Sequence, residues 1–90
     1  MLRLTVISRS AEEIVLQADG WVAGAYVDLL EREIRRHLQQ TEGLVLDLRG
    51  VRFIDRAGID VLREWMGAGL ALCGGSLFMR TLLEEYGLEK

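Results

Sequence analysis

The chain has 90 residues, half of them apolar, and a formal net charge of −3. A chain of this length forms one domain, here residues 1–90, and buries only about 60–65% of its unfolded surface, so its core is modest. Acidic and basic residues are interspersed without a basic patch or polybasic segment, which argues against nucleic acid and against direct membrane insertion. No stretch approaches about 18 consecutive apolar residues, and the N-terminus alternates apolar and polar residues, unlike a signal peptide. We therefore expect a cytoplasmic protein.

The N-terminal quarter of the chain is predicted to form strands. Apolar and polar residues alternate over residues 2–7 and again over residues 14–19, which is typical of strands with one buried face. The polar segment between them is short, so an antiparallel hairpin is expected. Gly20 allows a bend, and Trp21 with Val22 is compatible with a short third strand.

From about Gly24 to Gln40 the apolar period changes to that of a helix. Charged residues fill the positions between the apolar ones, so the segment is predicted to be an amphipathic helix lying on a sheet. We interpret His37 as an ordinary surface residue of this helix. The expected buried stripe consists of Ala23, Val27, Leu30, Ile34 and Leu38.

The segment GLVLDLRGVRFIDRAG, residues 43–58, is predicted to be the centre of the fold. Its first half is too short for an ordinary helix and apolar on both faces of a strand, which predicts a central strand covered on both sides. A second short apolar group follows at Val51, Phe53 and Ile54. Asp55 directly precedes a helical pattern, so we predict that its carboxylate caps the helix N-terminus. A buried strand that leads into a helix N-terminus is a common place for a site in α/β proteins.

A second helix is predicted from about Arg56 to Cys73, ended by Gly74 and Gly75. Residues 76–79 are then expected to form a short last strand, and residues 82–86 a short final helix closed by Gly87. Right-handed crossovers would place the first two helices on the same face of the sheet. The expected fold is an α/β sandwich with a mixed sheet of four to five strands, two main helices on one face and a short C-terminal helix.

These segments resemble the STAS domain, the module of bacterial anti-sigma factor antagonists and of the cytoplasmic tails of sulfate transporters. The family pattern is a strand ending in Asp-Leu-Ser-Gly, an apolar-Asp-Ser-Ser-Gly corner that opens a helix, and a Gly-Gly pair before the next strand. The corresponding residues here are DLRG at 47–50, IDRAG at 54–58 and GG at 74–75. The resemblance covers nearly the whole chain and implies the sandwich fold just described.

Two departures from the family pattern affect function. In switchable members, the resemblance implies, a partner kinase phosphorylates the second serine of the corner, and that position here is Ala57, which has no hydroxyl. Arg56 replaces the other serine. Because Ala57 has no hydroxyl, we predict that the corner is not phosphorylated. The second departure is the segment between the last expected strand and Gly87, which is shorter than the family pattern.

The predicted second helix carries two apolar stripes, and one helix cannot press both against one sheet. The first stripe, expected to face the sheet, consists of Ile59, Leu62, Met66, Leu70 and Cys73. The second consists of Val61, Trp65, Ala68 and Leu72. Either Trp65 folds between this helix and a neighbour, or the second stripe is a surface for a partner or for a symmetric homodimer.

Arg56 is a further signal, because a cation in the first turn of a helix opposes the helix dipole. It is either a solvated side chain without a role or a group that meets an acid on a partner.

Signals for an enzyme are weak. Asp47 and Asp55 could be imagined as an acid and base pair, but one lies within a strand and the other is assigned to a helix cap. Gly67, Gly69, Gly74 and Gly75 are expected toward the end of a helix, whereas a dinucleotide site needs its glycines between a strand and a helix N-terminus. Cys73 is expected to be a small buried residue and lies far from His37 in sequence, so no cofactor and no metal are predicted.

The resemblance and the corner together predict a non-enzymatic, regulatory protein-binding module. Its expected partner is an anti-sigma factor or another STAS-interacting regulator, and occupying an anti-sigma factor would keep it from holding a sigma factor. The alternatives are a scaffold subunit of a larger STAS assembly, an accessory subunit of a membrane transporter such as a lipid-transport ATPase complex, and a small-ligand carrier. The predicted partner-binding residues are Asp55, Arg56, Ala57, Gly58, Asp60, Val61, Trp65 and Ala68.

Overall fold

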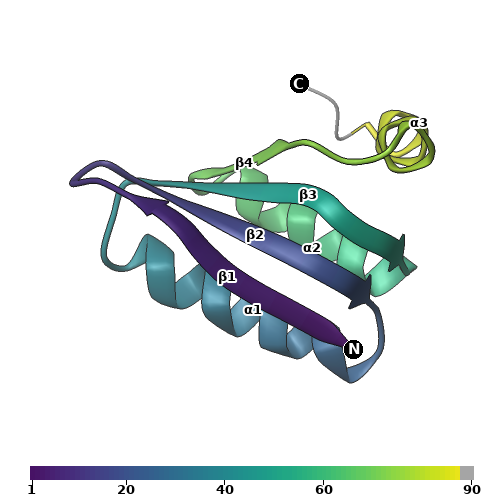
Figure 1. The fold of residues 1–90 in the computed structure, drawn as a ribbon, viewed down its shortest axis with the longest axis horizontal. Helices are drawn as coiled ribbons and strands as arrows, with labels where there is room; N and C mark the ends of the chain where they lie inside the picture. Colours follow the sequence, from purple (N-terminus) through teal and green to yellow (C-terminus); the bar gives the residue numbers. More distant parts are fainter. Residues whose placement is uncertain (88–90) are drawn as a thin grey trace.

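The computed structural model describes residues 1–87. Four strands and three helices follow one another along the chain (Figure 1). The strands are β1 (Leu2–Arg9), β2 (Glu13–Val22), β3 (Gly43–Ile54) and β4 (Leu70–Cys73). The helices are α1 (Ala25–Leu38), α2 (Arg56–Met66) and α3 (Leu77–Glu85).

The strands form one mixed sheet in the order β1-β2-β3-β4. β1 and β2 form the predicted antiparallel hairpin, while β3 is parallel to both β2 and β4. α1 and α2 connect the parallel strands and lie on the same face of the sheet (Figure 1). This confirms the predicted fold class, with four strands. The expected short third strand is the end of β2, and the apolar group after Gly50 is the end of β3.

The core lies between the sheet and this helical layer. The predicted α1 stripe is correct at its centre, where Val27, Leu30 and Ile34 are buried, because these residues recur once per helical turn on the side that faces the sheet. Every second residue of β2 faces the same layer, as the strand period requires. The buried β2 residues are Ile14, Leu16, Ala18 and Val22.

The C-terminal third differs from the prediction. α2 ends at Met66 and not at Cys73, and the expected second half of the helix is a turn followed by β4. Residues 76–79 open α3 instead of forming a strand, with the Ser76 hydroxyl accepting a bond from the Met79 N–H. The physical reasons are Gly69, whose φ of +116° ends the helical path, and the pairing of β4 with Leu44–Asp47 of β3, which buries Leu70 and Leu72.

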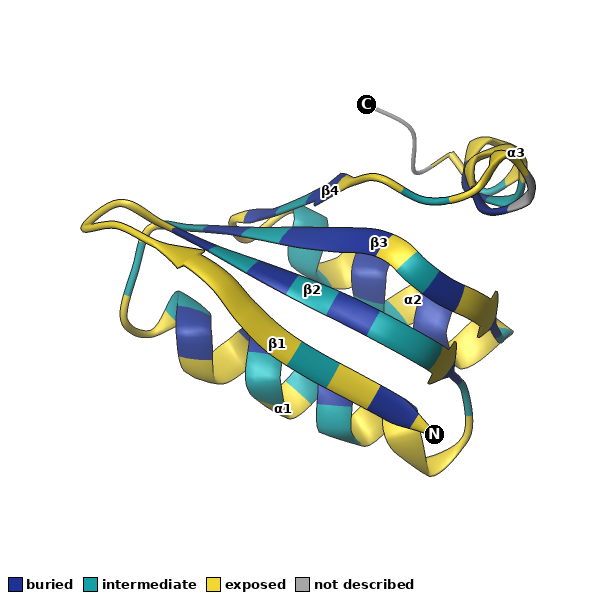
Figure 2. Ribbon diagram, in the orientation of Figure 1, coloured by how far each residue is buried: buried dark blue, intermediate teal, exposed yellow. Residues whose placement is uncertain are grey.

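The prediction that β3 is covered on both faces is also wrong. α1 and α2 cover one face, and we call the other the open face (Figure 2). On it Val45 is only half-buried, and Asp47 is buried through polar contacts and not by an apolar layer. The open face of β2 carries Val15, Gln17, Asp19 and Trp21, which alternate with its buried residues.

Two single residues also contradict their predictions. His37 is buried at 1% exposure, with neither ring nitrogen hydrogen-bonded within the described residues. It follows Ile34 by three positions and therefore shares the buried stripe of α1. Burial, reinforced by Arg36 and Arg9, lowers the pKa of His37. Cys73, expected to be buried, is exposed because it is the last residue of the short β4.

Within residues 1–87, no helix is both long enough and apolar enough to cross a bilayer.

Candidate partner-binding site

Asp55 organises the corner between β3 and α2. It adopts extended backbone as the helix N-cap, and its Oδ1 accepts a hydrogen bond from the Gly58 N–H at 2.8 Å. Its Oδ2 accepts a second bond, at 3.0 Å, from the N–H of Gly24, which precedes α1. The backbone N–H of Asp55 donates to the carbonyl of Val22 at 3.0 Å. One carboxylate therefore caps α2, as predicted, and also joins the starts of both helices.

Gly58 lets this corner pack tightly against the sheet. It is buried, and a Cβ at this position would lie 2.9 Å from the Val22 carbonyl oxygen and 2.8 Å from Ile54 Cγ1. Separations this short would force the neighbouring backbone to move. Gly58 thus allows α2 to lie close to the ends of β2 and β3. Because it is buried and has no side chain, its role in the corner is structural.

The outer side of the corner is exposed. Ala57, Arg56 and Asp60 are all exposed on the first turns of α2. Arg56 Nε lies 3.5 Å from Asp60 Oδ1, and its guanidinium lies 5.7 Å from the ring centroid of Tyr86. Arg63 donates to the Tyr86 carbonyl at 2.6 Å. Asp60 and the Tyr86 ring therefore offset the unfavourable position of Arg56 at the helix N-terminus.

The second apolar stripe does not exist as predicted. Leu72 is buried in β4 and Ala68 lies in the turn after α2, because the helix ends before both. Trp65 is half-buried between the helices, where its Nε1 donates to Glu31 Oε2 at 3.1 Å and Arg35 lies 5.5 Å from the ring centroid. Trp65 therefore joins α2 to α1, which was the structural alternative left open by the sequence.

Val61 is half-buried and packs against the core beside Trp65. Of the eight predicted partner-binding residues, the structure brings five together at the corner. They are Asp55, Arg56, Ala57, Gly58 and Asp60.

Asp47 and Asp55 have separate structural tasks, so they do not form an acid and base pair. Asp47 is 2% exposed and accepts bonds from Arg49, from the backbone N–H at 2.9 Å and from Nη2 at 2.6 Å. This contact raises the pKa of Arg49. Gly74, at φ +70°, passes so close to Asp47 that a Cβ would collide with its carboxylate. Among residues 1–87, no group of three acidic, histidine or cysteine side chains is placed to hold a metal ion.

The sequence reasoning missed two exposed aromatic residues beside the corner. Trp21 is 54% exposed and Phe53, which was predicted within an apolar group, is 45% exposed. They are paired in register at the ends of β2 and β3, and their ring centroids lie 5.8 Å apart. For Trp21 the available signal was the strand alternation with the buried Val22. For Phe53 no such signal exists, because the buried Val51 lies two residues before it and the register shifts between them.

Comparison with known families identifies the class of this fold. The family described as "Mlab, STAS domain" matches residues 5–90. The chain therefore belongs to the STAS domain family. Comparison with curated protein sequences gives no match.

Solved structures show the same fold at low sequence identity. An anti-sigma factor antagonist from Mycobacterium paratuberculosis is similar with a TM-score of 0.83 and 19% identity, covering 98% of this chain and 80% of that one. The unphosphorylated anti-sigma factor antagonist SpoIIAA gives a TM-score of 0.78 and 16% identity, with 98% and 82% covered. The phosphorylated form of the Bacillus cell fate determinant SpoIIAA gives 0.67 and 17%, with 98% and 85% covered.

Proposed function

We propose that this chain is a non-enzymatic regulatory module that binds a protein partner through the corner at the start of α2. The exposed contact residues are Arg56, Ala57 and Asp60, while Asp55 and Gly58 fix the shape beneath them. Both bonds of the Asp55 carboxylate are made within the chain, so the corner is already ordered before a partner arrives. Such preorganisation lowers the entropic cost of binding.

The observation that carries this proposal is Ala57. It is exposed beside an intact helix cap, at the position where the resemblance places a phosphorylatable serine. A methyl group there cannot accept a phosphate, so a kinase cannot introduce negative charge into the contact. The module would bind its partner without this switch.

An anti-sigma factor is the first candidate partner, supported by the antagonists of the same fold. The module would act by competition, occupying an anti-sigma factor that would otherwise hold a sigma factor in the cytoplasm. A permanent subunit of a larger assembly, such as a STAS scaffold or a membrane transporter complex, is the second candidate. It is favoured by a corner whose Ala57 cannot accept a phosphate, because a permanent subunit needs no such switch.

Affinity capture from the source cells, followed by mass spectrometry, tests both candidates. The bait proteins are the wild-type chain, Ala57→Asp, and Arg32→Glu as a charge control on an exposed position of α1. An acid near a helix N-terminus favours the helix, so Ala57→Asp should fold normally. The expected result is a partner retained by the wild type and the control and weakened about tenfold or more by Ala57→Asp. Equal capture by all three baits would overturn the proposal, and the partner's identity separates the two candidates.

A further inference from the structure

The open face carries a second exposed feature that the corner does not use. Trp21 and Phe53 expose about half of their surface beside one another, although large apolar side chains in a small domain are usually buried. Trp21 alternates with the buried Val22 and therefore lies on the open face, opposite α1 and α2. Phe53 lies on the same face, because it is paired in register with Trp21 and their ring centroids are 5.8 Å apart. The pair is therefore an accessible apolar anchor point that the chain's own helices leave unpaired.

A shallow depression lies directly beside this pair. Its lining includes residues that precede each aromatic in its strand, Gly20 in β2 and Arg52 in β3. Cross-strand pairing places Met1 and Leu2 alongside, with the Met1 carbonyl accepting the Trp21 N–H at 2.8 Å. The aromatic pair and the depression thus form one continuous surface, which we call the open-face groove.

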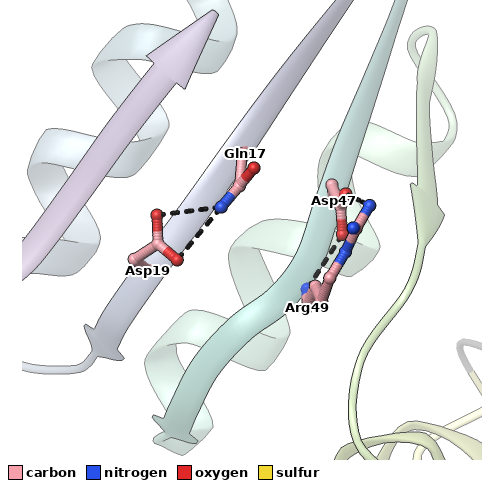
Figure 3. Close-up of polar contacts among 4 residues, drawn as sticks. All are labelled: Gln17, Asp19, Asp47 and Arg49. Carbon is pink, nitrogen blue, oxygen red and sulfur yellow. Dashed lines mark hydrogen bonds and ion pairs between the residues drawn. The ribbon is translucent and has the colours of Figure 1, made fainter. Parts of the chain in front are cut away.

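Three arginines line the open-face groove, which is unexpected in a chain of net charge −3. Arg49 is held by Asp47, whereas Arg3 and Arg52 form no ion pair with any residue in 1–87. The acid that lines the groove, Asp19, accepts two hydrogen bonds from Gln17, at 3.2 and 3.3 Å (Figure 3). Asp19 lies opposite Arg3 in the β1–β2 register without forming an ion pair with it, and Arg52 directly precedes Phe53. The groove therefore offers two guanidinium groups that form no ion pair within residues 1–87, beside an apolar anchor point.

From this arrangement we propose that the open-face groove binds an acidic segment of a protein partner. One apolar side chain of the segment packs on Trp21 and Phe53, and carboxylates beside it meet Arg3 and Arg52. Arginine and tryptophan are the residue types that most often dominate binding energy at protein interfaces. This inference goes beyond the proposed function, because the groove adjoins the α2 corner but consists of other residues, so the two can be tested with separate variants.

The charge of the groove and of the whole chain favours an acidic protein segment over two other occupants, a second copy of the chain and a nucleic acid. A second copy of the chain in a symmetric dimer would bring the same groove against itself, so Arg3 and Arg52 would face like charges. A nucleic acid would place a long row of phosphates across a chain of net charge −3. A short acidic segment needs only the local positive charge that the groove supplies.

Nuclear magnetic resonance titration of the isotope-labelled full chain tests the proposal. The probe is a terminally blocked hexapeptide of alternating glutamate and phenylalanine, with the glutamine analogue as its charge control. The expected result is saturable shift changes centred on Gly20, Trp21 and Phe53, with affinity falling as salt rises from about 0.05 to about 0.5 M. Trp21→Ala and Arg52→Glu should each weaken binding by about fivefold or more. The matched controls Ile7→Ala and Arg32→Glu, both at exposed positions outside the groove, should change it less than twofold.

Several outcomes would overturn the proposal. These are no saturable shifts at millimolar peptide, equal binding of the glutamine analogue, or shifts confined to residues 55–60. Concentration-dependent dimerisation that Trp21→Ala abolishes would assign the groove to a second copy. Tighter binding of a single-stranded oligonucleotide at the same amides would assign it to nucleic acid. None of these outcomes bears on the Ala57→Asp experiment, so the two proposals fail separately.

Discussion

Replacing Asp55 by alanine should destabilise the domain by about 2 kcal/mol. The variant loses the cap bond to the Gly58 N–H, and removal of a side-chain cap typically costs about 1 kcal/mol. It also loses the bond to the Gly24 N–H, which contributes about 1 kcal/mol at a partly exposed site. Asp55→Asn separates the two contributions, because asparagine caps helices about as well as aspartate but has only one acceptor oxygen. The expected loss for Asp55→Asn is therefore about 1 kcal/mol.

Urea denaturation measures both losses. With a slope of about 1 kcal/mol per molar urea, the midpoint should fall by about 2 M for Asp55→Ala and about 1 M for Asp55→Asn. Glu64→Ala, at an exposed position of the same helix, is the control and should change stability by about 0.5 kcal/mol or less. A loss below about 0.5 kcal/mol for Asp55→Ala, or equal losses for the two Asp55 variants, would refute the assignment of two bonds to one carboxylate.

Two further predictions concern the helical layer. Trp65→Ala should cost about 2 kcal/mol of stability in urea denaturation, less than a fully buried tryptophan because the residue is only partly buried. A loss below about 0.5 kcal/mol would contradict its role between the helices. Burial lowers the pKa of His37 in the folded state, so folding favours the neutral imidazole. The contribution of His37 to the free energy of unfolding should therefore be fully present above about pH 6.5, and stability should decline as the pH falls below that value. His37→Leu should flatten the stability profile between about pH 7 and pH 5, and an unchanged decline would show that another group causes it.

The amphipathic pattern of α1 and the capping position of Asp55 were predictable because both depend on neighbours within a few residues. The end of α2 was not, since Leu70 and Leu72 continue an apolar pattern that suits a helix or a strand. The strand forms because these residues pair with Leu44–Asp47 of β3, which lie far away in sequence. The position of β4 could therefore not be predicted from the local sequence pattern alone.

The exposure of a side chain was predictable where the helical or strand periodicity of its element is unbroken, and not predictable elsewhere. His37 continues the spacing of Leu30 and Ile34, so its burial could have been inferred from the same stripe. Phe53 is different, because the pairing of β2 with β3 shifts register just before it, and a one-residue shift changes the face on which a side chain lies. The grouping of the five corner residues was predictable because Asp55 is the helix cap and the other four lie in the first turn and a half of the helix that it caps.

The central claim is that a protein partner contacts the exposed side of the α2 corner. The most direct measurement is a chemical-shift footprint of the captured partner on the isotope-labelled chain. The account predicts that the largest changes cluster at the amides of Arg56, Ala57 and Asp60, and that Ala57→Asp removes them while leaving the free protein folded. Changes confined to other surfaces, with the corner amides unmoved at saturation, would contradict it.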